Sequence, residues 1–553
     1  MEKGRAMASE ETAGKKKGQI RELFRRQEGM ITVYLSMAFL LIMGVGFCVI
    51  EGVREYQLSS LEEDAFISAG RGILANYDRQ LYSQYQLFFL DPRERTGLLQ
   101  EGRDILDQRF VSKGFYAASS QNLEVGEEVF ATDRQGRVLH HQIRKLMKYE
   151  AVGEAADRLT EWIGLLQNED YGRQRDRIED IQDHEEAAEE EKEERESKER
   201  DRVKETGTSA DREGNTEAVD NGTKRQKDPA ESPEGRRWKA LKSTITGIIR
   251  AGILNYVVDD PKMLSQAHIP EGGLPSHMTD QGGTSSVSLP DISFSGLGYL
   301  SSFFSHSLAE DYRGPVPLED MMDIRYACLH FNHYGAIMNK EALLKYEMEY
   351  LCIGRESDLD NLKGVVRRII LLRFATNFAF ACTDSEITGE AEAMADILAG
   401  AVDMPALASA VKVSLIGALS YGETLLDVHA LLEGGKIPLV KSSDAWNLTF
   451  FNAPEKLAEK SRVKAGRYNL DYENFLQIIL LCQKKKVRML YRMMDLMQIN
   501  IRQKEEGFFM KDCLFSFKLK GSLYAGKWFP VIPIFDLVSD KVMHTDLTRV
   551  FSY

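Results

Sequence analysis

The histidines of the C-terminal half are the first residues whose spacing could support chemistry. His330 and His333 lie three residues apart, a spacing that metal sites on helices use. Such a site also needs a carboxylate or a third histidine nearby, and Glu319 and Asp320 precede the pair by about three helical turns. We therefore expect a surface or helix-capping role for both histidines, and we predict no metal site and no cofactor.

Two glutamates offer a second arrangement of groups that could do chemistry. Glu347 and Glu349 stand two residues apart, and on a helix such side chains point in different directions. A general acid and base must converge on one substrate, so this spacing is unfavourable for acid–base catalysis. We expect the two carboxylates to pair instead with arginines of a neighbouring helix, namely Arg367, Arg368 or Arg373.

Known catalytic motifs are missing from the sequence. It contains no GxSxG elbow, HExxH pair, Walker loop or GxGxxG turn. The stretch Leu274–Met278 departs from an LPxTG sorting signal. We predict that the protein is not an enzyme and that it has no catalytic residues.

Composition narrows the classes of partner. The net charge of −14 argues against nucleic acid, because phosphate binding needs a basic surface. The six cysteines form no CxxC pair, so neither a zinc site nor a thioredoxin-type site is indicated. We expect most of them to be small buried hydrophobic residues, with one disulfide outside the cell left open.

The segment that must position everything else is an uncharged stretch from Met30 to Ile50. Its length matches a helix that crosses a bilayer, ~20 residues. Basic residues precede it and mostly acidic residues follow it, which predicts a cytoplasmic N-terminus and an extracytoplasmic remainder. A cleaved signal peptide is the alternative, but its apolar region would be shorter and would end in a small-residue cleavage site. We expect a retained single-pass anchor in the cell membrane.

An apolar stripe continues beyond this stretch at helical spacing as far as Phe88. The pattern predicts one amphipathic helix from about Ile31 to Phe89, ended by Asp91-Pro92. Short strands are expected around a turn at 133–136, followed by a helix over 143–166. Further expected helices are 238–258, 318–333, 341–353, 358–382 with Asp358 as its N-cap, 387–401, 404–433 ended by Gly434-Gly435, and 471–503.

Together these elements predict a mainly α fold with a small antiparallel β element, of the α+β class. The last forty residues or so supply the strands, with a turn at Gly521-Ser522 and extended segments at 529–535 and 549–551. A polar Gly- and Ser-rich loop is expected over 269–290. The expected division is 1–29 cytoplasmic basic segment, 30–50 transmembrane helix, 51–90 amphipathic stalk, 91–167 extracytoplasmic α/β segment, 168–237 charged insertion that is disordered or a single helix, 238–503 helical extracytoplasmic domain and 504–553 C-terminal β element.

A family resemblance rests on the start of the apolar stretch and on several later segments. Residues 28–36, EGMITVYLS, resemble the TadE/TadG-like proteins of tight-adherence (Tad/Flp) pilus loci. Segments 76–91, 346–350, 423–428, 435–440 and 494–502 are similar to an uncharacterised domain-of-unknown-function family found beside Tad genes in Gram-positive bacteria. The resemblance implies a location and a pilin-like helix. It supplies no reaction.

The resemblance also marks Gly29 and Met30 as a candidate boundary for prepilin-type processing. Processed pilins usually carry Glu at the fifth residue after the glycine, and this chain has Tyr34 there. Gly29 is then a processing site or only a helix-boundary residue.

The function that follows is a membrane-anchored, extracytoplasmic structural or assembly component of a Tad-type (Flp) pilus or related surface secretion system. Its expected partners are membrane lipid and other pilin-like or Tad assembly proteins, with no nucleic acid. The alternative is an extracytoplasmic ligand-binding or sensor domain on a single-pass anchor. A surface hydrolase with an unrecognised site is a third hypothesis. The sequence leaves the oligomeric state and cleavage after Gly29 open.

Overall fold

The computed structural model describes residues 2–90, 95–110, 114–148, 157–158, 160–161, 232–270, 272–278, 318–400, 408–466, 469–483, 486–528 and 542–553. Contacts divide the chain into two units. Unit 1 comprises Met1–Tyr82, Phe88–Ala131 and Asp512–Tyr553, and unit 2 comprises Ser83–Leu87 and Thr132–Lys511. Unit 2 is therefore inserted into the sequence of unit 1. The division predicted from the sequence has consecutive segments only and does not include this insertion.

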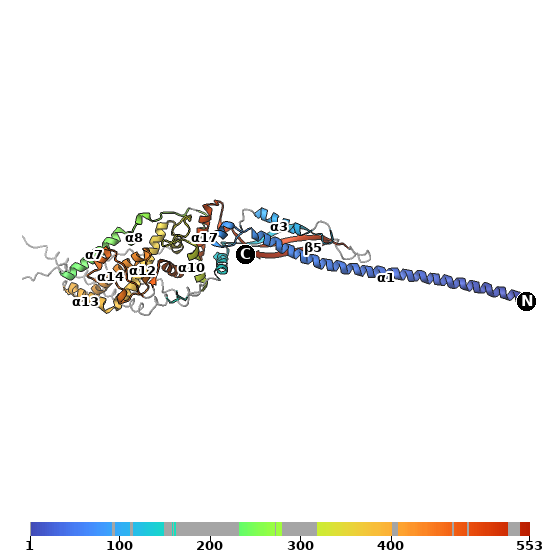
Figure 1. Cartoon of the computed structure of the whole chain (residues 1–553), viewed down its shortest axis with the longest axis horizontal. Helices are drawn as coiled ribbons and strands as arrows, with labels where there is room; N and C mark the ends of the chain where they lie inside the picture. The colour runs from blue at the N-terminus through green and yellow to red at the C-terminus, as the bar shows by residue number, and fades with distance from the viewer. Residues whose placement is uncertain are drawn as a thin grey trace, which may run out of the picture. The chain divides into compact units, whose positions relative to one another are not determined.

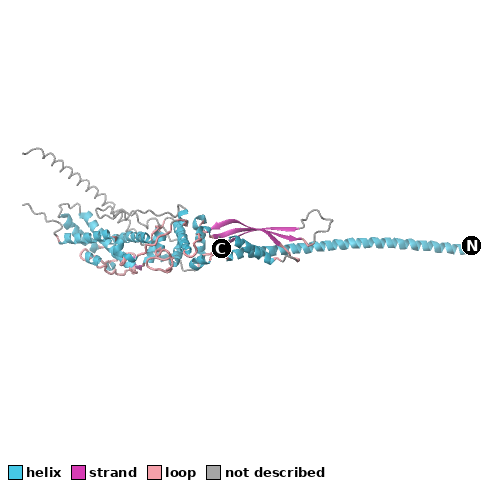
Figure 2. Cartoon of the chain, turned by 90° about the horizontal axis from the view of Figure 1, so that it is seen from above, coloured by secondary structure: helices cyan, strands magenta, loops and turns pink. Residues whose placement is uncertain are grey.

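Unit 1 combines helices with one antiparallel sheet. Its helices are α1 (Glu2–Ala75), α2 (Arg79–Tyr85), whose last residues fall in unit 2, and α3 (Arg95–Arg109). The strands β1 (Ser119–Phe130), β4 (Leu514–Gly526) and β5 (Val542–Ser552) pair in the order β1-β4-β5. Figure 1 and Figure 2 show α1 running past these strands, with α3 beside it. The predicted small antiparallel sheet is confirmed.

The C-terminal part of α1 packs on the sheet through close interlocking contacts. Phe66 of α1 lies against Gly521 of β4, where a Cβ atom would stand 2.8 Å from its ring. In the reverse sense, Phe551 of β5 lies against Gly70 of α1, where a Cβ atom would stand 2.3 Å from the ring. Both phenylalanines are buried and their ring centroids are 6.1 Å apart. Glycine is needed at both positions because any side chain would occupy the space of the ring.

The expected single helix to Phe89 is wrong, because α1 ends at Ala75. The chain then turns, and the amide of Asp78 donates to the carbonyl of Phe89 at 2.8 Å. The Asp78 carboxylate accepts the amide of Leu81 at 2.8 Å and so starts α2. Tyr77 and Phe88, which extended the apolar stripe in the sequence, form an edge-on aromatic pair at 5.2 Å. The apolar spacing thus continues past the end of α1, through residues that pack on one another but do not belong to one helix.

The strands expected around residues 133–136 also differ from the structure. Residues of β1 form one strand that pairs with β4, far away in the sequence. The turn at 133–136 is a short 3-10 segment in which Arg134, Gln135 and Gly136 have left-handed backbone angles, at φ 54°, 59° and 76°. The residues after it form α4 (Arg137–Met147), which covers only the first part of the expected helix over 143–166. A local hairpin was the simpler prediction because sequence alone does not show a strand partner so remote.

Unit 2 is mainly helical. Its helices are α4, α7 (Pro233–Ala251), α8 (Ile253–Val257), α10 (Leu318–His330), α11 (Glu347–Ile353), α12 (Asp358–Thr383), α13 (Ser385–Gly400), α14 (Ala408–Leu432), α15 (Ala453–Ala458), α16 (Tyr472–Leu481) and α17 (Lys486–Arg502). The short 3-10 helices are η2 (Asp133–Gly136), η4 (Pro261–Met263), η5 (Pro275–Met278), η7 (Ser443–Ala445) and, at the junction with unit 1, η8 (Met510–Asp512). A short antiparallel pair joins β2 (Ile437–Pro438) to β3 (Asn469–Leu470).

Most of the helices expected in this region are present, with some changed ends. The helices α12 and α13 match the expectation closely, and Gly434 follows α14 at φ 81°, as its predicted stop requires. The expected helix 471–503 is divided into α16 and α17, and α11 begins only at Glu347. Ser357, not Asp358, is the N-cap residue of α12. The Asp358 carboxylate accepts the amides of Lys345 and Tyr346 instead.

Other expectations concern the ends of these elements or fall on residues that are not described. The helix expected from Trp238 starts earlier, at Pro233, with Ser232 accepting the amide of Gly235. The expected turn at Gly521-Ser522 lies inside the continuous strand β4. Residues 168–231 of the charged segment, 279–290 of the polar loop and the extended segment 529–535 lie outside the described residues.

Candidate functional site

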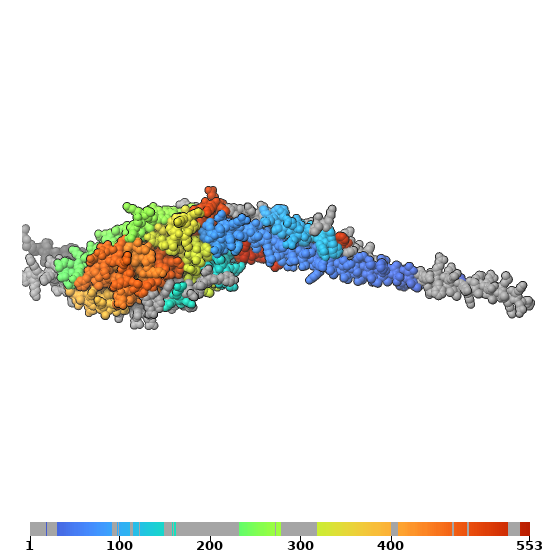
Figure 3. All heavy atoms as spheres, viewed as in Figure 1, coloured from blue at the N-terminus to red at the C-terminus, as the bar shows by residue number. Residues whose placement is uncertain are grey.

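The middle of α1, from Met30 to Ile50, exposes a long apolar surface. From Met30 onward it contains a window of mean hydropathy 2.4 of which 6% is buried. Large side chains are open to the surroundings on every side of the helix, including Ile31, Leu41 and Val49, each at least 60% exposed. In the space-filling view no other coloured segment covers this blue stretch on the face shown (Figure 3). Within the part of the chain that the structure describes, it is the one helix long and apolar enough to cross a membrane.

Gly29 and Met30 both lie within α1, which runs without a break from Glu2 to Ala75. The suggestion that Gly29 marks a helix boundary is therefore wrong. Met30 is 61% exposed and begins the apolar surface. A peptidase would have to act on an intact helix at this bond, or before that helix has formed.

A buried arginine marks the point where the exposed stretch of α1 meets the sheet of unit 1. Arg54 is 1% exposed. It pairs with Glu51 one turn earlier at 2.6 Å, and it donates to the carbonyls of Phe115 and, at 2.8 Å, of Gly526. A buried guanidinium needs such partners for most of its N–H groups. Arg54 thereby fixes α1 to the end of β4 and to the segment before β1.

The Arg54 guanidinium lies 5.5 Å from the centre of the Phe115 ring. Phe115 in turn contacts Tyr116 and Trp528, and we call these three residues the aromatic collar. The Phe115 ring stacks edge-on against Trp528 at 5.6 Å and against Tyr116 at 5.1 Å. Trp528 is 53% exposed, and its indole N–H donates to the carbonyl of Gly114 at 3.2 Å. Large rings with one apolar part and one polar group are characteristic of membrane–water interfaces.

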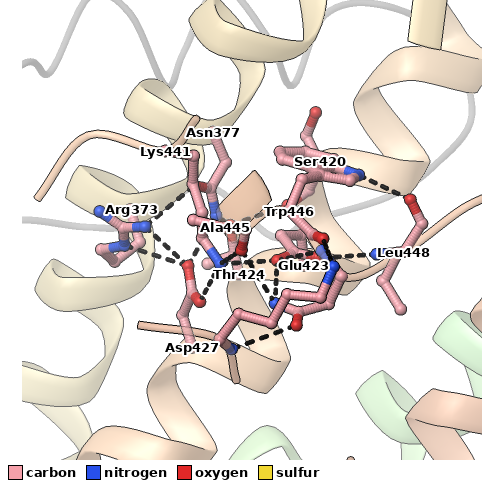
Figure 4. A network of polar contacts seen from close by, with 12 residues as sticks. Arg373, Asn377, Ser420, Glu423, Thr424, Asp427, Lys441, Ala445, Trp446 and Leu448 are labelled. Carbon is pink, nitrogen blue, oxygen red and sulfur yellow. Dashed lines mark hydrogen bonds and ion pairs between the residues drawn. The ribbon is translucent and has the colours of Figure 1, made fainter. Parts of the chain in front are cut away.

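Unit 2 contains a different feature, a cluster of four buried charges that we call the ionic cluster. Its members are Arg373 of α12, Glu423 and Asp427 of α14, and Lys441 after β2, none more than 3% exposed. Arg373 pairs with Asp427 at 2.7 Å. Lys441 bridges the two acids, at 2.6 Å from Glu423 and 2.7 Å from Asp427. Figure 4 shows these side chains pointing toward one another from the two helices and the loop. Two cations and two anions balance, as burial of charge requires.

The ionic cluster also holds the loop that follows β2. Glu423 accepts the side-chain amide of Asn447 at 2.6 Å and the backbone amide of Leu448 at 3.1 Å. Arg373 donates to the carbonyl of Leu439 at 2.6 Å. Burial opposes ionisation of Asp427, but Lys441 and Arg373 outweigh it and hold the pKa of this carboxyl below its ordinary value. With every charge paired and shielded from water, the cluster fits a structural role.

Glu347 and Glu349 occupy buried positions in α11, but their expected pairing with arginines is wrong. Glu347 accepts the amide of Asn332 at 2.8 Å and the side-chain amide of Asn500 at 2.6 Å. Glu349 accepts the amide of Tyr334 at 2.8 Å and the hydroxyl of Tyr472 at 2.8 Å. Burial raises the pKa of each carboxyl to about 7.

Two of the three arginines proposed for these carboxylates make other contacts. Arg373 belongs to the ionic cluster, and Arg368 donates to the carbonyl of Cys352 at 3.0 Å. Glu347 and Glu349 bond to different groups, so the geometry agrees with the expectation that they do not form an acid–base pair. They organise the loop between α10 and α11.

The two histidines singled out by their spacing have separate roles. His330 stacks on Tyr326 at 4.2 Å, and its Nδ1 donates to the carbonyl of Tyr326 at 3.0 Å, which is a contact of the last turn of α10. His333 is 6% exposed, and its Nε2 lies 4.0 Å from Glu473. Burial lowers the pKa of both imidazoles. The predicted capping role suits His330, whereas His333 belongs to the core.

Potential metal ligands converge at another place among the described residues. Asp259, His429 and Glu433 each bring one ligand atom into a group in which all lie within 4.8 Å of one another. This group was not predicted from the sequence. The spacing of His429 and Glu433, four residues apart on an expected helix, was the available signal, whereas Asp259 comes from a remote segment.

The predicted buried character of the cysteines is confirmed for Cys328, Cys352 and Cys513, each at most 6% exposed. Burial raises the pKa of the Cys352 thiol to about 12. A thiol that stays protonated is a poor nucleophile and a poor metal ligand. These cysteines therefore pack as small apolar side chains.

Comparison with known proteins adds one finding to this geometry. Searches of curated proteins and of solved structures each returned no match. The profile of one family, described as a family of unknown function (DUF5702), matches residues 232–524. The match begins at the N-cap of α7 and ends within β4, so it covers most of unit 2 and the central strand of unit 1. Because it spans more than half of the sequence, the chain belongs to the family of unknown function DUF5702.

Proposed function

We propose that the protein is a membrane-anchored, extracytoplasmic structural component of a surface assembly, and that it has no catalytic activity. In this proposal the apolar stretch Met30–Ile50 of α1 lies in the membrane and meets other apolar helices there. Unit 1 stands at the membrane surface, and unit 2 is the large extracytoplasmic module. The assembly is a Tad-type (Flp) pilus or a related surface secretion system.

The observation that carries the proposal is the division of α1 into two kinds of surface. Between Met30 and Ile50 its large apolar side chains are exposed around the helix, whereas Ala65, Phe66 and Ala69 are buried against the sheet. A water-soluble protein rarely leaves so long an apolar surface uncovered. Lipid and neighbouring helices are the partners that such a surface fits.

The aromatic collar and its surroundings support the placement of the membrane boundary. The exposed rings of Tyr116 and Trp528 gather beside Arg54, directly after the apolar stretch ends at Ile50. Lys527 adds a cation that contacts Glu55 at 3.6 Å. Aromatic and basic side chains concentrate at this depth of membrane proteins.

The link to a Tad-type assembly rests on residues 28–36 and on the long helix that follows them. A helix with an exposed apolar stretch at 30–50 and a C-terminal part packed on an antiparallel sheet suits a subunit that assembles laterally through its apolar stretch. The non-catalytic role draws support from the ionic cluster, because its charges are paired and buried.

Site-specific photo-crosslinking in intact cells tests the assembly role. A photoreactive residue at Leu40, which is 65% exposed on α1, should crosslink to lipid and to apolar N-terminal helices of pilin-like or Tad platform proteins. The matched control is Val550 of β5, which is 62% exposed. Equal crosslinking from both positions, or products from Leu40 that contain lipid alone, would contradict the assembly role.

Protease protection tests the orientation separately. In intact cells stripped of their wall, external protease should remove unit 2 and leave a protected fragment that includes Met30–Ile50. Mass spectrometry of the mature N-terminus then distinguishes a chain that begins at Met30 from an unprocessed anchor. Protection of unit 2 from external protease would overturn the proposed topology.

A further inference from the structure

A histidine and two carboxylates converge where the end of α14 meets the segment after α8. His429 and Glu433 are four residues apart, and the amide of Glu433 still donates to the carbonyl of His429 at 3.0 Å, so both lie on one helical turn. Asp259 follows α8. Potential ligand atoms of all three lie within 4.8 Å of one another. Ligand pairs four apart on a helix, completed by a residue from elsewhere, are common in metal sites.

The imidazole of His429 makes a backbone hydrogen bond of the kind that orients metal ligands. Its Nδ1 lies 3.2 Å from the carbonyl oxygen of Val257. Because a carbonyl can only accept a hydrogen bond, Nδ1 carries a proton, and in a neutral imidazole Nε2 then has the lone pair. Histidine ligands of metals typically donate their other ring N–H to a carbonyl or carboxylate in this way. Val257 belongs to the same short segment as Asp259, so that segment both orients the histidine and supplies a carboxylate.

A lysine already neutralises part of this group. Lys460 lies 2.8 Å from the Asp259 carboxylate, and its hydrogen bond holds the pKa of that carboxyl below the ordinary value. The ammonium group also lies 5.7 Å from the centre of the Tyr256 ring. Lysine and a metal ion would compete for the same carboxylate, since both are cations that bind the same oxygens.

We propose that Asp259, His429 and Glu433 bind one divalent transition-metal ion, with Zn²⁺ as the representative. One imidazole nitrogen and two carboxylates form a three-ligand set of a kind that Zn²⁺ accepts, and two carboxylates balance its charge. Calcium and magnesium prefer oxygen ligands alone, so the imidazole disfavours them. The ion would fasten the end of α14 to the segment after α8. This inference goes beyond the proposed assembly function and departs from the sequence-based prediction of no metal site.

Zinc titration of the full-length protein in detergent micelles tests this site. The protein is first freed of metal with a chelator, and calorimetry together with elemental mass spectrometry then gives the affinity and the amount bound. We expect one Zn²⁺ per chain at the site, and Glu433→Gln and His429→Ala each weaken binding at least tenfold. The exposed His268 provides the control His268→Ala, which should bind zinc as the unchanged protein does.

Lys460→Met gives a result that no purely structural ion pair would produce. Removing the competing ammonium should tighten zinc binding severalfold. In the presence of chelator, the same variant should be less stable to unfolding, because it lacks the ion pair between Lys460 and Asp259. Glu433 is exposed, so Glu433→Gln remains informative even if His429→Ala fails to fold. Unchanged zinc affinity in Glu433→Gln, weaker binding in Lys460→Met, or preferential binding of Ca²⁺ would overturn the proposal.

Discussion

The Arg54 guanidinium of α1 donates a hydrogen bond of 2.8 Å to the carbonyl of Gly526, 472 residues later in the chain. This contact joins the start of the packed part of α1 to the end of the central strand. Because Arg54 is buried, replacing it with leucine removes the hydrogen bonds of two carbonyls and leaves Glu51 without its cation.

We predict that Arg54→Leu destabilises unit 1 by about 3 kcal/mol, the lower end of the range found when one partner of a buried ion pair is removed. Denaturant unfolding of the protein in detergent measures the loss. The control is Arg549→Ala, because Arg549 makes an exposed pair with Glu63 at 3.3 Å, and such pairs contribute less than about 1 kcal/mol. Equal effects of the two variants would contradict the role assigned to Arg54.

The ionic cluster gives a second prediction. Asp427→Asn leaves Arg373 and Lys441 with one carboxylate between them, so unit 2 should lose about 3–5 kcal/mol. Tryptophan fluorescence follows the unfolding, because Trp446 lies buried in the loop that the cluster holds. Lys363→Met, which breaks an exposed pair with Asp360, should change stability by less than about 0.5 kcal/mol. Normal stability of Asp427→Asn would show that the cluster does not hold the loop.

The stability of unit 2 should depend on pH through Glu349. Its pKa is raised from 4.5 to about 7 by burial, so between these values the folded state holds a proton that the unfolded state has released. The contribution of this group is therefore greatest below pH 4.5 and is lost as the pH rises to about 7. Its upper limit is on the order of 3 kcal/mol, from about 1.4 kcal/mol per pH unit.

The variant Glu349→Gln isolates this effect. A glutamine oxygen can still accept from Tyr334 and Tyr472, and its amide replaces the carboxylate oxygen that has no hydrogen-bond partner among the described residues. Unfolding free energies measured between pH 4.5 and 8 should fall less steeply in the variant than in the unchanged protein. Parallel pH profiles would argue against a protonated Glu349 in the fold.

Two glycines of α1 should respond in opposite directions to alanine. In Gly70→Ala the new methyl group meets the Phe551 ring, so unit 1 loses about 1–3 kcal/mol. In Gly52→Ala nothing lies within 4 Å of the new atom, and alanine favours the helix by up to about 1 kcal/mol. The double variant Gly70→Ala with Phe551→Leu should recover part of the loss. If the stability losses of Gly70→Ala and Phe551→Leu simply add in the double variant, the two residues are not in contact.

Local patterns in the sequence were sufficient for much of the fold. The uncharged stretch Met30–Ile50, the helical periods of α12 and α13 and the stop at Gly434 depend on neighbouring residues alone. The mainly α class with a small antiparallel sheet followed from them. The end of α1 could not be predicted, since Tyr77 and Phe88 keep the apolar spacing while packing on each other.

The contacts of buried polar groups were much harder to predict. Glu349 bonds to Tyr472, 123 residues away, and Arg373 pairs with Asp427, 54 residues away. Sequence spacing suggests which types of residue can meet, but the choice of partner is made by tertiary packing. For the same reason the approach of Asp259 to His429 could not be predicted, because the two residues meet only in the folded chain.

The insertion of unit 2 between β1 and β4 also determines the order in which the protein can be completed. During synthesis α1 and β1 leave the ribosome early, yet β1 must wait for the whole of unit 2 before its partner strand exists. Until then its backbone edge is unpaired and open to pairing with other chains. Closure of the sheet by β4 and β5 is thus a late, long-range step. A chain truncated before β4 should therefore expose β1 as an unpaired strand.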